Sequence, residues 1–411
     1  MLSLSKTLPL FFFASTSLFA TTASIQPVAN MPAPKPATKT PVSKTGKEIP
    51  CDSPEICSIG HGVTLSGSFL WWRATENLSS YAQVVTKENI INPEEGLGSP
   101  RGHNQPIHYK WDPGFNVRLG VDVDSDCWDL FADWTWYHNS TKNSITAITT
   151  GSNDPFSGLV GTMNAMGIYA SWIPKWVPAH ATDTFSGLPV QPLLAGPFAE
   201  AKVKWNLSYN TFNLELGKSF KTRTNLLRPF FGLRGALIER TVKVDYNHYH
   251  DSGSLLTPTP LLGAPFVLEG FDSASYKTNM HFWGLGPLLG VIDEFRLGAG
   301  FRLMGQFAAG FLYGRMHSYE QYSLRHFVGG APSVFAGDKF TNHNQWSPAT
   351  NLQMRLGINW STCLNHQRNE FLIGAAWEQN IWFFHGMSAN TDQGSMNLIL
   401  GGLTATAQFK F

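Results

Sequence analysis

The last stretch of the chain alternates between apolar and polar residues with a period of two. Counting back from the end, one face carries Phe411, Phe409, Ala407, Ala405, Leu403, Gly401 and Ile399, and the other carries Lys410, Gln408, Thr406, Thr404 and Gly402. Successive side chains of a β-strand point to opposite faces, so the pattern predicts a strand with one apolar and one polar face. Residues 370–383 repeat it. Such a pair is typical of strands that meet lipid on one side and a wet lumen on the other.

The same alternation recurs along the chain and predicts ten strands. They cover residues 63–71, 115–122, 128–136, 203–216, 227–240, 283–291, 296–313, 352–360, 370–383 and 399–411. Within the fourth strand the apolar residues change parity near Thr211, which predicts a β-bulge. Charged residues occupy every second position of several strands. They would be very costly against hydrocarbon, so we expect them to face inward.

The connections between these strands alternate between short and long. Short ones are expected near 122–127, 221–225, 292–295 and 361–369, and long ones near 76–106, 143–201, 247–275, 317–345 and 385–394. This order is typical of periplasmic turns and external loops, with both termini in the periplasm. The sequence therefore predicts an all-β fold, an antiparallel transmembrane β-barrel of about 10–12 strands. Twelve strands would need contributions from the 143–201 connection or from a short strand at Tyr81 to Val85.

The N-terminal residues predict export. Lys6 precedes an apolar run from Leu8 to Ala20 that ends in small residues and is too short to span a bilayer. We expect a signal peptide at 1–23, a Pro- and Lys-rich periplasmic linker with a Cys pair at 24–61, and the outer-membrane β-barrel at 62–411. No later segment holds about 18 consecutive apolar residues, so a closed barrel is the remaining way for an exported chain to cross lipid.

Composition and motifs narrow the function classes. The chain of 411 residues is 14% charged and has a net charge of +1, which argues against a nucleic-acid partner because such partners favour a basic patch. The sequence has no recognisable nucleophile elbow or serine–histidine–acid set, so we expect no enzyme and no cofactor. His248, His250 and Asp251 come near metal-ligand spacing, but a solvated loop explains them better, so no metal site is expected.

Charged residues on the inward parity are the candidate pore lining. The cations are Arg118, Lys204, Arg228, Arg234, Arg296, Arg302, Arg355 and Lys410, and the anions are Asp122, Asp129, Asp133, Glu215 and Glu378. A ring of charge in a lumen sets ion preference, and the excess of cations predicts a mild preference for anions. The alternative is that these side chains pair across the lumen as salt bridges that brace it. The sequence leaves both open.

The four cysteines are all expected on the periplasmic side. Cys51 and Cys57 lie in the linker, and Cys127 and Cys363 lie at two of the short turns. An exported protein meets an oxidising compartment, so we expect a local disulfide between Cys51 and Cys57. Cys127 or Cys363 could form disulfides to a second copy or to other envelope proteins. Free thiols at these two positions are the alternative.

Several motifs carry a resemblance to a known family. They are FLWWRA at 69–74, WDL at 128–130, WTWYH at 134–138, NLELG at 213–217, LRPFFGLRGA at 227–236, FWGLGP at 282–287, LYGR at 312–315 and WEQNIWF at 377–383. By these the chain resembles the Legionella-type pore-forming outer-membrane protein family and is similar to the major-outer-membrane-protein-like porins of environmental chlamydiae. The resemblance covers about residues 62–411. It implies a general diffusion pore and transfers no catalytic residues.

Two functions follow as expectations. The first is an outer-membrane porin for passive diffusion of small hydrophilic solutes or ions, with the lipid of the outer membrane around it. The second is a structural or adhesive barrel whose lumen is plugged by the 143–201 connection and which is cross-linked to its neighbours. Inward glycines (Gly284, Gly286, Gly298, Gly300 and Gly310) favour the pore. A narrow ring favours the plugged barrel, because about eight strands leave a lumen that side chains just fill.

Overall fold

A computed structural model describes most of the predicted barrel and little of the N-terminal region. The described residues are 62–76, 80–85, 103–123, 127–147, 167–171, 198–222, 224–249, 256–257, 266–267, 273–328, 331–335, 339–364, 369–384 and 397–411. The predicted signal peptide (1–23), nearly all of the linker (24–61) and most of the 143–201 connection lie outside them. Their boundaries stay predictions. The described part contains no helix of the length and hydropathy needed to cross a membrane.

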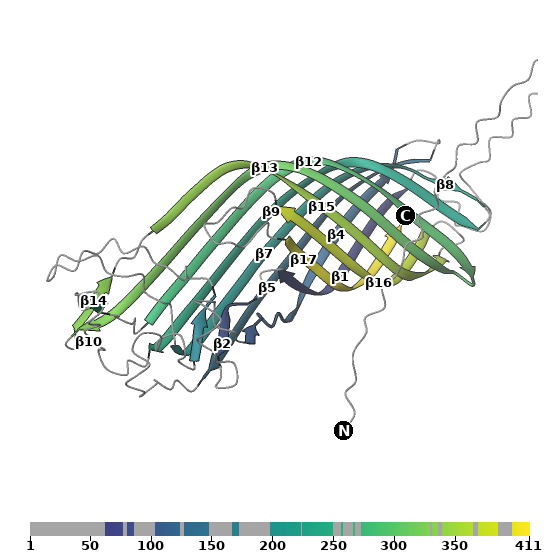
Figure 1. Cartoon of the computed structure of the whole chain (residues 1–411). Helices are drawn as coiled ribbons and strands as arrows, with labels where there is room; N and C mark the ends of the chain where they lie inside the picture. Colours follow the sequence, from purple (N-terminus) through teal and green to yellow (C-terminus); the bar gives the residue numbers. More distant parts are fainter. Residues whose placement is uncertain are drawn as a thin grey trace, which may run out of the picture. The chain divides into compact units, whose positions relative to one another are not determined.

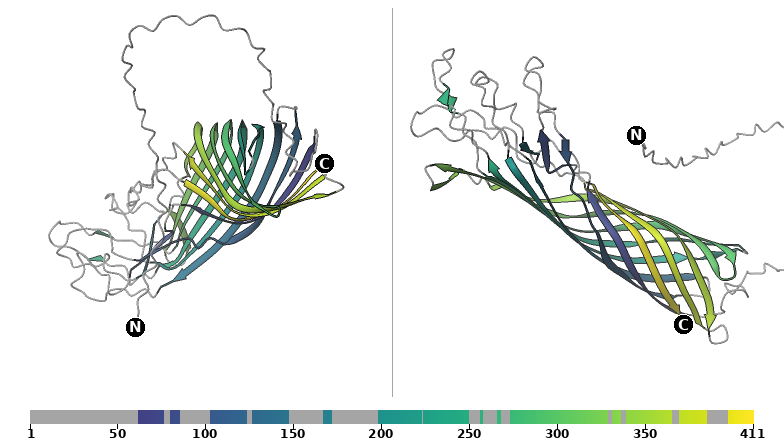
Figure 2. Two further views of the ribbon diagram at one scale, coloured as in Figure 1. Left: turned by 90° about the vertical axis from the view of Figure 1, so that its right-hand side faces the viewer. Right: turned by 90° about the horizontal axis from the view of Figure 1, so that it is seen from below.

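Ten long antiparallel strands close into a ring, as the alternation predicted (Figures 1 and 2). They are β1 (Val63–Glu76), β4 (Trp111–Asp122), β5 (Trp128–Thr146), β7 (Phe198–Lys218), β9 (Asn225–Tyr249), β12 (Ser273–Gly298), β13 (Phe301–Val328), β15 (Lys339–Leu364), β16 (Asn369–Phe384) and β17 (Asn397–Lys410). Each strand pairs with the next one in this order, and β17 pairs with β1. Closure pairs the backbone groups around the ring, which is what crossing a bilayer with strands requires.

The short turns lie at one end of the ring, but one of them is not where the sequence predicted it. The turn between β12 and β13 is at residues 298–301, not at 292–295. Its residues Gly298, Ala299 and Gly300 have positive φ values of 97°, 51° and 83°. Two of the three are glycines, which adopt positive φ at little cost. Asp293 and Glu294 resemble turn residues in composition. In the structure they lie within β12 and pair with Gly305 and Met304 of β13.

The predicted bulge near Thr211 is wrong. β7 keeps one unbroken register against both β5 and β9, so residues of odd number face inward from Ala201 to Gly217. What changes near Thr211 is the polarity of the two faces. Below it the apolar residues Phe212 and Leu214 face outward, and above it the buried residues Trp205 and Leu207 face inward. The apolar residues change face because the surroundings of the strand change from lipid to water, and this change was interpreted as a bulge.

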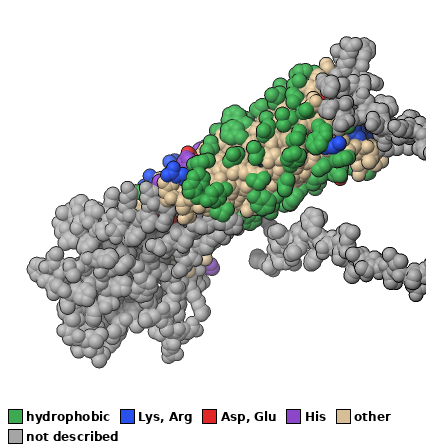
Figure 3. All heavy atoms as spheres, turned by 90° about the horizontal axis from the view of Figure 1, so that it is seen from above, with side chains coloured by type: hydrophobic (Ala, Val, Ile, Leu, Met, Phe, Trp, Pro, Cys, Tyr) green, Lys and Arg blue, Asp and Glu red, His purple; other side chains and the backbone are tan. Residues whose placement is uncertain are grey.

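The exterior of the ring carries an apolar band on the half nearer the short turns. Figure 3 shows hydrophobic side chains spread over this part of the surface, with backbone and other atoms between them and few charged side chains. On β9 its last large residue is Leu237, and on β12 it is Trp283, both exposed. Farther along the same strands the outward residues are polar, beginning with Glu239 and His281. Because a lipid-facing surface must be apolar, the strands continue beyond the bilayer on the side of the long connections.

The interior has the opposite polarity. In the lipid-level half most inward side chains are polar or charged, apart from a small apolar cluster of Phe230, Leu288 and Ala308, and beyond the band they form a large apolar core. Its largest fully buried members are Trp72, Trp205, Trp382, Tyr137, Tyr246, Phe198, Phe282, Phe384, Leu70, Ile168, Leu207 and Ile238. A barrel segment with water outside gains stability by burying apolar surface inside, so this half is built like a soluble barrel.

Short strands add to this core. β2 (Ala82–Val85) lies in the segment where a short strand was predicted; it pairs with β3 (His103–Gln105) and with β6 (Gly167–Ala170). Ala82 and Ile168 are fully buried, and Tyr109 packs edge-on against Trp205 with ring centroids 5.0 Å apart. These strands fill the mouth of the ring and do not enlarge it to twelve. The other short strands are β8 (Phe220–Lys221), β10 (Leu256–Thr257), β11 (Phe266–Val267) and β14 (Ala331–Phe335).

The inward glycines do not leave open space, which corrects the sequence-based expectation. A Cβ on Gly284 would meet the ring of Phe282 at 2.7 Å, and one on Gly310 would touch Arg234 at 3.3 Å. Gly298 and Gly300 belong to a turn. At Gly232 a Cβ would overlap the carbonyl oxygen of Leu214. Glycine here permits a close approach of neighbouring strands in a strongly curved wall.

We expect Gly232→Ala to destabilise the barrel by about 1–3 kcal/mol, because the added methyl group meets backbone that cannot move aside. The control is Gly67→Ala, where nothing lies within 4 Å of the new Cβ. That change should shift the free energy of unfolding by less than about 0.5 kcal/mol. Denaturant midpoints of the refolded variants in one detergent give the comparison. Equal midpoints would contradict the close-approach role.

Candidate functional site: the polar chamber of the barrel

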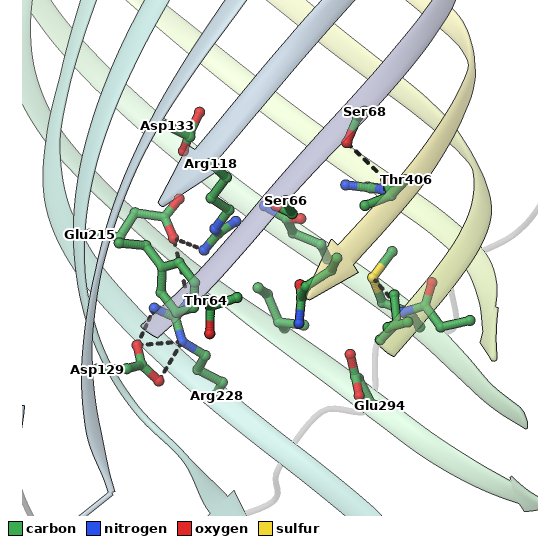
Figure 4. Close-up of a pocket in the computed structure, with 18 of the residues that line it drawn as sticks. Thr64, Ser66, Ser68, Arg118, Asp129, Asp133, Glu215, Arg228, Glu294 and Thr406 are labelled. Atoms are coloured by element: carbon green, nitrogen blue, oxygen red, sulfur yellow. Dashed lines mark hydrogen bonds and ion pairs between the residues drawn. The ribbon is translucent and has the colours of Figure 1, made fainter. Parts of the chain in front are cut away.

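The lipid-level half of the barrel encloses a polar cavity of about 650 Å³, called here the chamber. Inward side chains of all ten ring strands line it, because each strand presents every second residue to the interior. Figure 4 shows several of them converging from opposite walls. The chamber reaches the short-turn end of the ring, where Cys127, Lys221 and Lys410 line it. At its other end stands the apolar core.

One wall of the chamber is a chain of ion pairs across four neighbouring strands. Arg228 donates from Nε to both carboxylate oxygens of Asp129, at 2.8 and 3.0 Å, and its Nη1 lies 3.4 Å from Glu215 Oε2. Arg118 Nη2 donates to the same Glu215 oxygen at 2.6 Å. Both guanidinium groups also lie over the ring of Phe131, at 4.2 Å for Arg118 and 4.8 Å for Arg228. Figure 4 shows this cluster. Stacking and pairing fix both arginines against the wall.

A second network crosses the lumen at Arg234. This residue of β9 donates from Nε to Asn213 Oδ1 of β7 at 2.7 Å, and from its Nη atoms to Asn351 and Gln353 of β15. The Gln353 contact is 2.6 Å. β15 lies three strands away around the ring, so the guanidinium spans the interior. Asp133 extends the network, since it accepts from Asn213 Nδ2 at 3.0 Å.

The network ends at the apolar core. Gln353 Nε2 donates to Glu378 Oε1 at 2.8 Å, and Thr404 Oγ1 donates to Glu378 Oε2 at 3.1 Å. Trp72 Nε1 in turn donates to Thr404 Oγ1 at 3.1 Å. A row of hydrogen bonds therefore marks the boundary between the chamber and the apolar core, where Trp72 contacts both. Next to it, Trp382 packs against Tyr209 and Phe384, with ring centroids 6.1 and 6.2 Å apart.

A buried ion pair ties opposite walls together inside the core. Arg240 Nη1 of β9 lies 3.1 Å from Glu76 Oε2 of β1, and both side chains are almost completely excluded from solvent. The two strands are four places apart in a ring of ten, so the pair crosses the interior. Removing one partner of such a pair leaves a buried charge uncompensated. The Arg240–Glu76 ion pair thus holds the opposite walls of the core together in addition to the packing of its apolar side chains.

At the short-turn end the chamber has a second set of charges. Arg302 donates to Glu370 at 2.6 Å and to Glu294 at 3.2 Å, and Lys410 Nζ lies 2.7 Å from Asp122 Oδ2. Glu294, Glu370 and Lys221 were missing from the predicted lining. Glu294 was placed in a turn, and Glu370 was recognised as inward but not counted.

Most of the predicted lining residues face the interior. Arg118, Asp122, Asp129, Asp133, Glu215, Arg228, Arg302, Arg355, Glu378 and Lys410 line the chamber. Arg234 crosses the lumen next to it, and Arg296 lies on the inward parity of β12 near its end without lining the chamber. Lys204 is exposed on the outer face of β7, because inward residues of that strand have odd numbers.

The charges of the chamber nearly balance, and most are paired. Its described lining has six cations, Arg118, Lys221, Arg228, Arg302, Arg355 and Lys410, and seven anions, Asp122, Asp129, Asp133, Glu215, Glu294, Glu370 and Glu378. The excess of cations that predicted anion preference is not found in this lining. Among the described lining residues, Arg355 has no carboxylate within ion-pair distance; its Nη2 donates to Thr406 Oγ1 at 2.6 Å.

Two of the four cysteines can be placed. Cys127 and Cys363 lie at the short-turn end and are both disulfide-bonded, so neither is a free thiol. Cys51 and Cys57 lie outside the described residues, and the pairing of the four stays a prediction. His250 and Asp251 of the near-metal-spaced set also lie outside. Among the described residues, no group of three or more His, Cys, Asp and Glu side chains is placed to hold a metal ion.

Comparisons with known proteins agree with the architecture. The model of the family described as the Legionella pneumophila major outer membrane protein precursor matches residues 58–411. No curated protein matches the chain.

Solved structures similar to the chain include the outer membrane protease OmpT from Escherichia coli, at 10% identity, 86% of this chain, 98% of that chain and a TM-score of 0.30. A Pseudomonas aeruginosa FadL homologue matches at 9% identity, 85% of this chain and 90% of that chain, with a TM-score of 0.24. The Pseudomonas putida toluene transporter TodX matches at 9% identity, over 85% of this chain and 89% of that chain, with a TM-score of 0.21. Scores of this size carry no argument about function.

We expect Arg228→Gln to destabilise the barrel by about 3 kcal/mol, because it leaves the carboxylate of Asp129 buried without its partner. Adding Asp129→Asn should recover more than half of that loss, since no charge then remains to be compensated. The control is Lys410→Gln, whose pair with Asp122 is more exposed, at 25% for each side chain, so that its loss should cost less than about 1 kcal/mol. Unfolding in denaturant measures these variants together with Asp129→Asn alone; a double variant as unstable as the sum of both single variants would contradict the pairing.

Proposed function

Because the chain belongs to the family of the Legionella pneumophila major outer membrane protein and lies in the outer membrane, we propose that it is a narrow channel for small hydrophilic solutes and ions. The solutes would diffuse passively, driven by their concentration differences. The observation that carries the proposal is the polar chamber at the level of the apolar exterior band. Water and ions are far more stable in a cavity lined by charged side chains than in the hydrocarbon around the ring. The chamber is therefore the place where they would cross the bilayer.

The apolar core defines the narrowest part of the proposed pathway. Trp72, Tyr209, Trp382 and Phe384 are at most 2% exposed, so a solute that leaves the chamber toward the long connections must displace large side chains. Apolar constrictions gate channels by excluding water. We therefore expect rare openings of small conductance rather than a wide, permanently open pore.

A structural barrel with a filled lumen is the second candidate. The same core favours it, because the strands themselves and β2 and β6 fill the interior. The plug that the sequence placed in the 143–201 connection would then be built largely from inward residues of the ring. A structural role needs no pathway, so it differs from the channel in one property, which is ion conduction.

We propose no enzymatic activity. The charged side chains of the chamber pair with each other, as Arg228 does with Asp129 and Arg302 with Glu370. The described chamber lining holds no histidine, and its cysteine, Cys127, is disulfide-bonded. A nucleophile there would lack the usual neutral base.

Trp382→Ala should raise the single-channel conductance, because it removes a large side chain from the constriction. The control is Trp377→Ala on the same strand, β16, which removes the same side chain from the outer face, where it is 50% exposed. That variant should conduct like the native protein. Purified, refolded protein in a planar lipid bilayer provides the measurement. If native protein and Trp382→Ala are both silent while correctly folded, the channel is wrong and the structural barrel stands.

Arg355→Gln should shift the reversal potential toward cation preference. Arg355 is the chamber arginine without an ion-paired carboxylate among the described residues, although Glu378 stands opposite it in the strand register, so its charge is compensated less directly than that of the others. Native protein should show weak selectivity under a salt gradient, because the lining charges nearly balance. The control is Arg315→Gln on the outer face of β13, which should leave the reversal potential unchanged. An equal shift in both variants would contradict a role for Arg355 in the pathway.

A further inference from the structure

Four lysines lie directly opposite one another on the outer face of neighbouring strands. Lys142 of β5 pairs in register with Lys204 of β7, Lys204 with Lys243 of β9, and Lys243 with Lys277 of β12. We call them the lysine row. Their separation along the chain hides the arrangement from the sequence, where Lys204 was read as a lumen residue. The strand register alone brings them together.

Most of this charge is uncompensated. Lys243 Nζ lies 2.8 Å from Asp245 Oδ2. Lys142, Lys204 and Lys277 have no carboxylate partner among the described residues. Like charges directly opposite each other on a sheet are destabilising. Repulsion among the four lysines therefore destabilises the barrel on its own, and an anion bound across them would remove this repulsion.

The polar neighbours of the lysine row suit an oxygen-rich ligand. The next outward row toward the apolar band consists of Ser140, Asn206, Thr241 and Asn279, on the same four strands. Hydroxyl and amide groups beside ammonium groups can hydrogen-bond to sugar hydroxyls while the lysines meet phosphate or carboxylate. The surface thus combines charge with hydrogen-bonding capacity.

The lysine row lies at a definite height above the apolar band. Lys243 and Lys277 are six residues beyond Leu237 and Trp283, the last large apolar residues facing outward on their strands. Six residues of a tilted strand rise about 15 Å. Between the row and the band lie Arg315, His281 and His317 on β12 and β13, and on β9 Glu239, whose carboxylate is 2.8 Å from His281 Nε2. Figure 3 shows basic and histidine side chains just beyond one end of the band.

We propose that the lysine row binds the anionic saccharide head of an outer-leaflet glycolipid through its phosphate and carboxylate groups. The side with long connections faces outward in a barrel of this kind. A glycolipid anchored beside the apolar band would carry its charged sugars past Arg315 and up to the lysines. The lysine row stands above the lipid-facing band on the same strands, which favours a ligand anchored in the lipid over a soluble protein, which would not need the band.

The test compares two double variants of the full-length protein, refolded in one detergent. The first is Lys142→Gln with Lys204→Gln, two exposed lysines of the row. The matched control is Arg73→Gln with Lys218→Gln, which removes the same charge from outward positions on β1 and at the short-turn end of β7, away from the row. The probe is a lipid A that carries two phosphates and two acidic core sugars, titrated at two salt concentrations. The same lipid without its phosphates and acidic sugars, and a soluble polyglutamate, are titrated alongside.

We expect the row variant to bind the charged glycolipid at least about tenfold more weakly than the native protein, since each lysine near such a surface contributes about 1 kcal/mol. Native binding should weaken with added salt, and the control variant should bind like the native protein. The uncharged glycolipid should bind alike to all three. Equal binding of the row variant and the native protein overturns the proposal. So does a loss confined to polyglutamate, which would indicate an acidic protein partner.

Discussion

The structure depends on closing ten strands into a ring narrow enough that inward side chains meet across it. Closure satisfies the backbone, and narrowness decides what the interior can hold. Arg234 reaches from one wall to Asn351 on another, and Arg240 reaches Glu76 in the same way. In a wider ring these side chains would end in water. Here they hold the walls at fixed separations and divide the interior into a wet chamber and a dry core.

The sequence predicted the ring because alternation and connection length are local properties. The ten strands, their antiparallel order and the parity of β16 and β17 follow from residues such as Trp377 and Glu378, which differ in polarity at adjacent positions. The inward placement of Arg118, Arg228 and Arg355 follows from the same rule. The ion pairs of Arg118 and Arg228 do not follow from it, because they join residues far apart along the chain, such as Arg228 with Asp129.

The wrong bulge at Thr211 and the wrong assignment of Lys204 have one physical source, which is that polarity reports the surroundings of a side chain and not its direction. At Thr211 the surroundings change from lipid outside to water outside, and the apolar residues move from one face to the other without any break in the strand. Lys204 was therefore assigned to the lumen. The turn after β12 was misplaced because acidic residues near the rim, Asp293 and Glu294, resemble turn residues in composition. Positive φ at Ala299 carries no comparable signal in the sequence.

The division of the barrel has a thermal consequence. The half beyond the apolar band buries Trp205, Ile238 and Phe282 away from water, so its cohesion carries the large heat capacity of hydrophobic burial. Within the bilayer the same ring exposes its apolar residues to lipid and gains little from that effect. Cooling weakens burial from water. The dry core should therefore loosen at low temperature before the lipid-embedded ring does, which gives one continuous sheet two responses to cold.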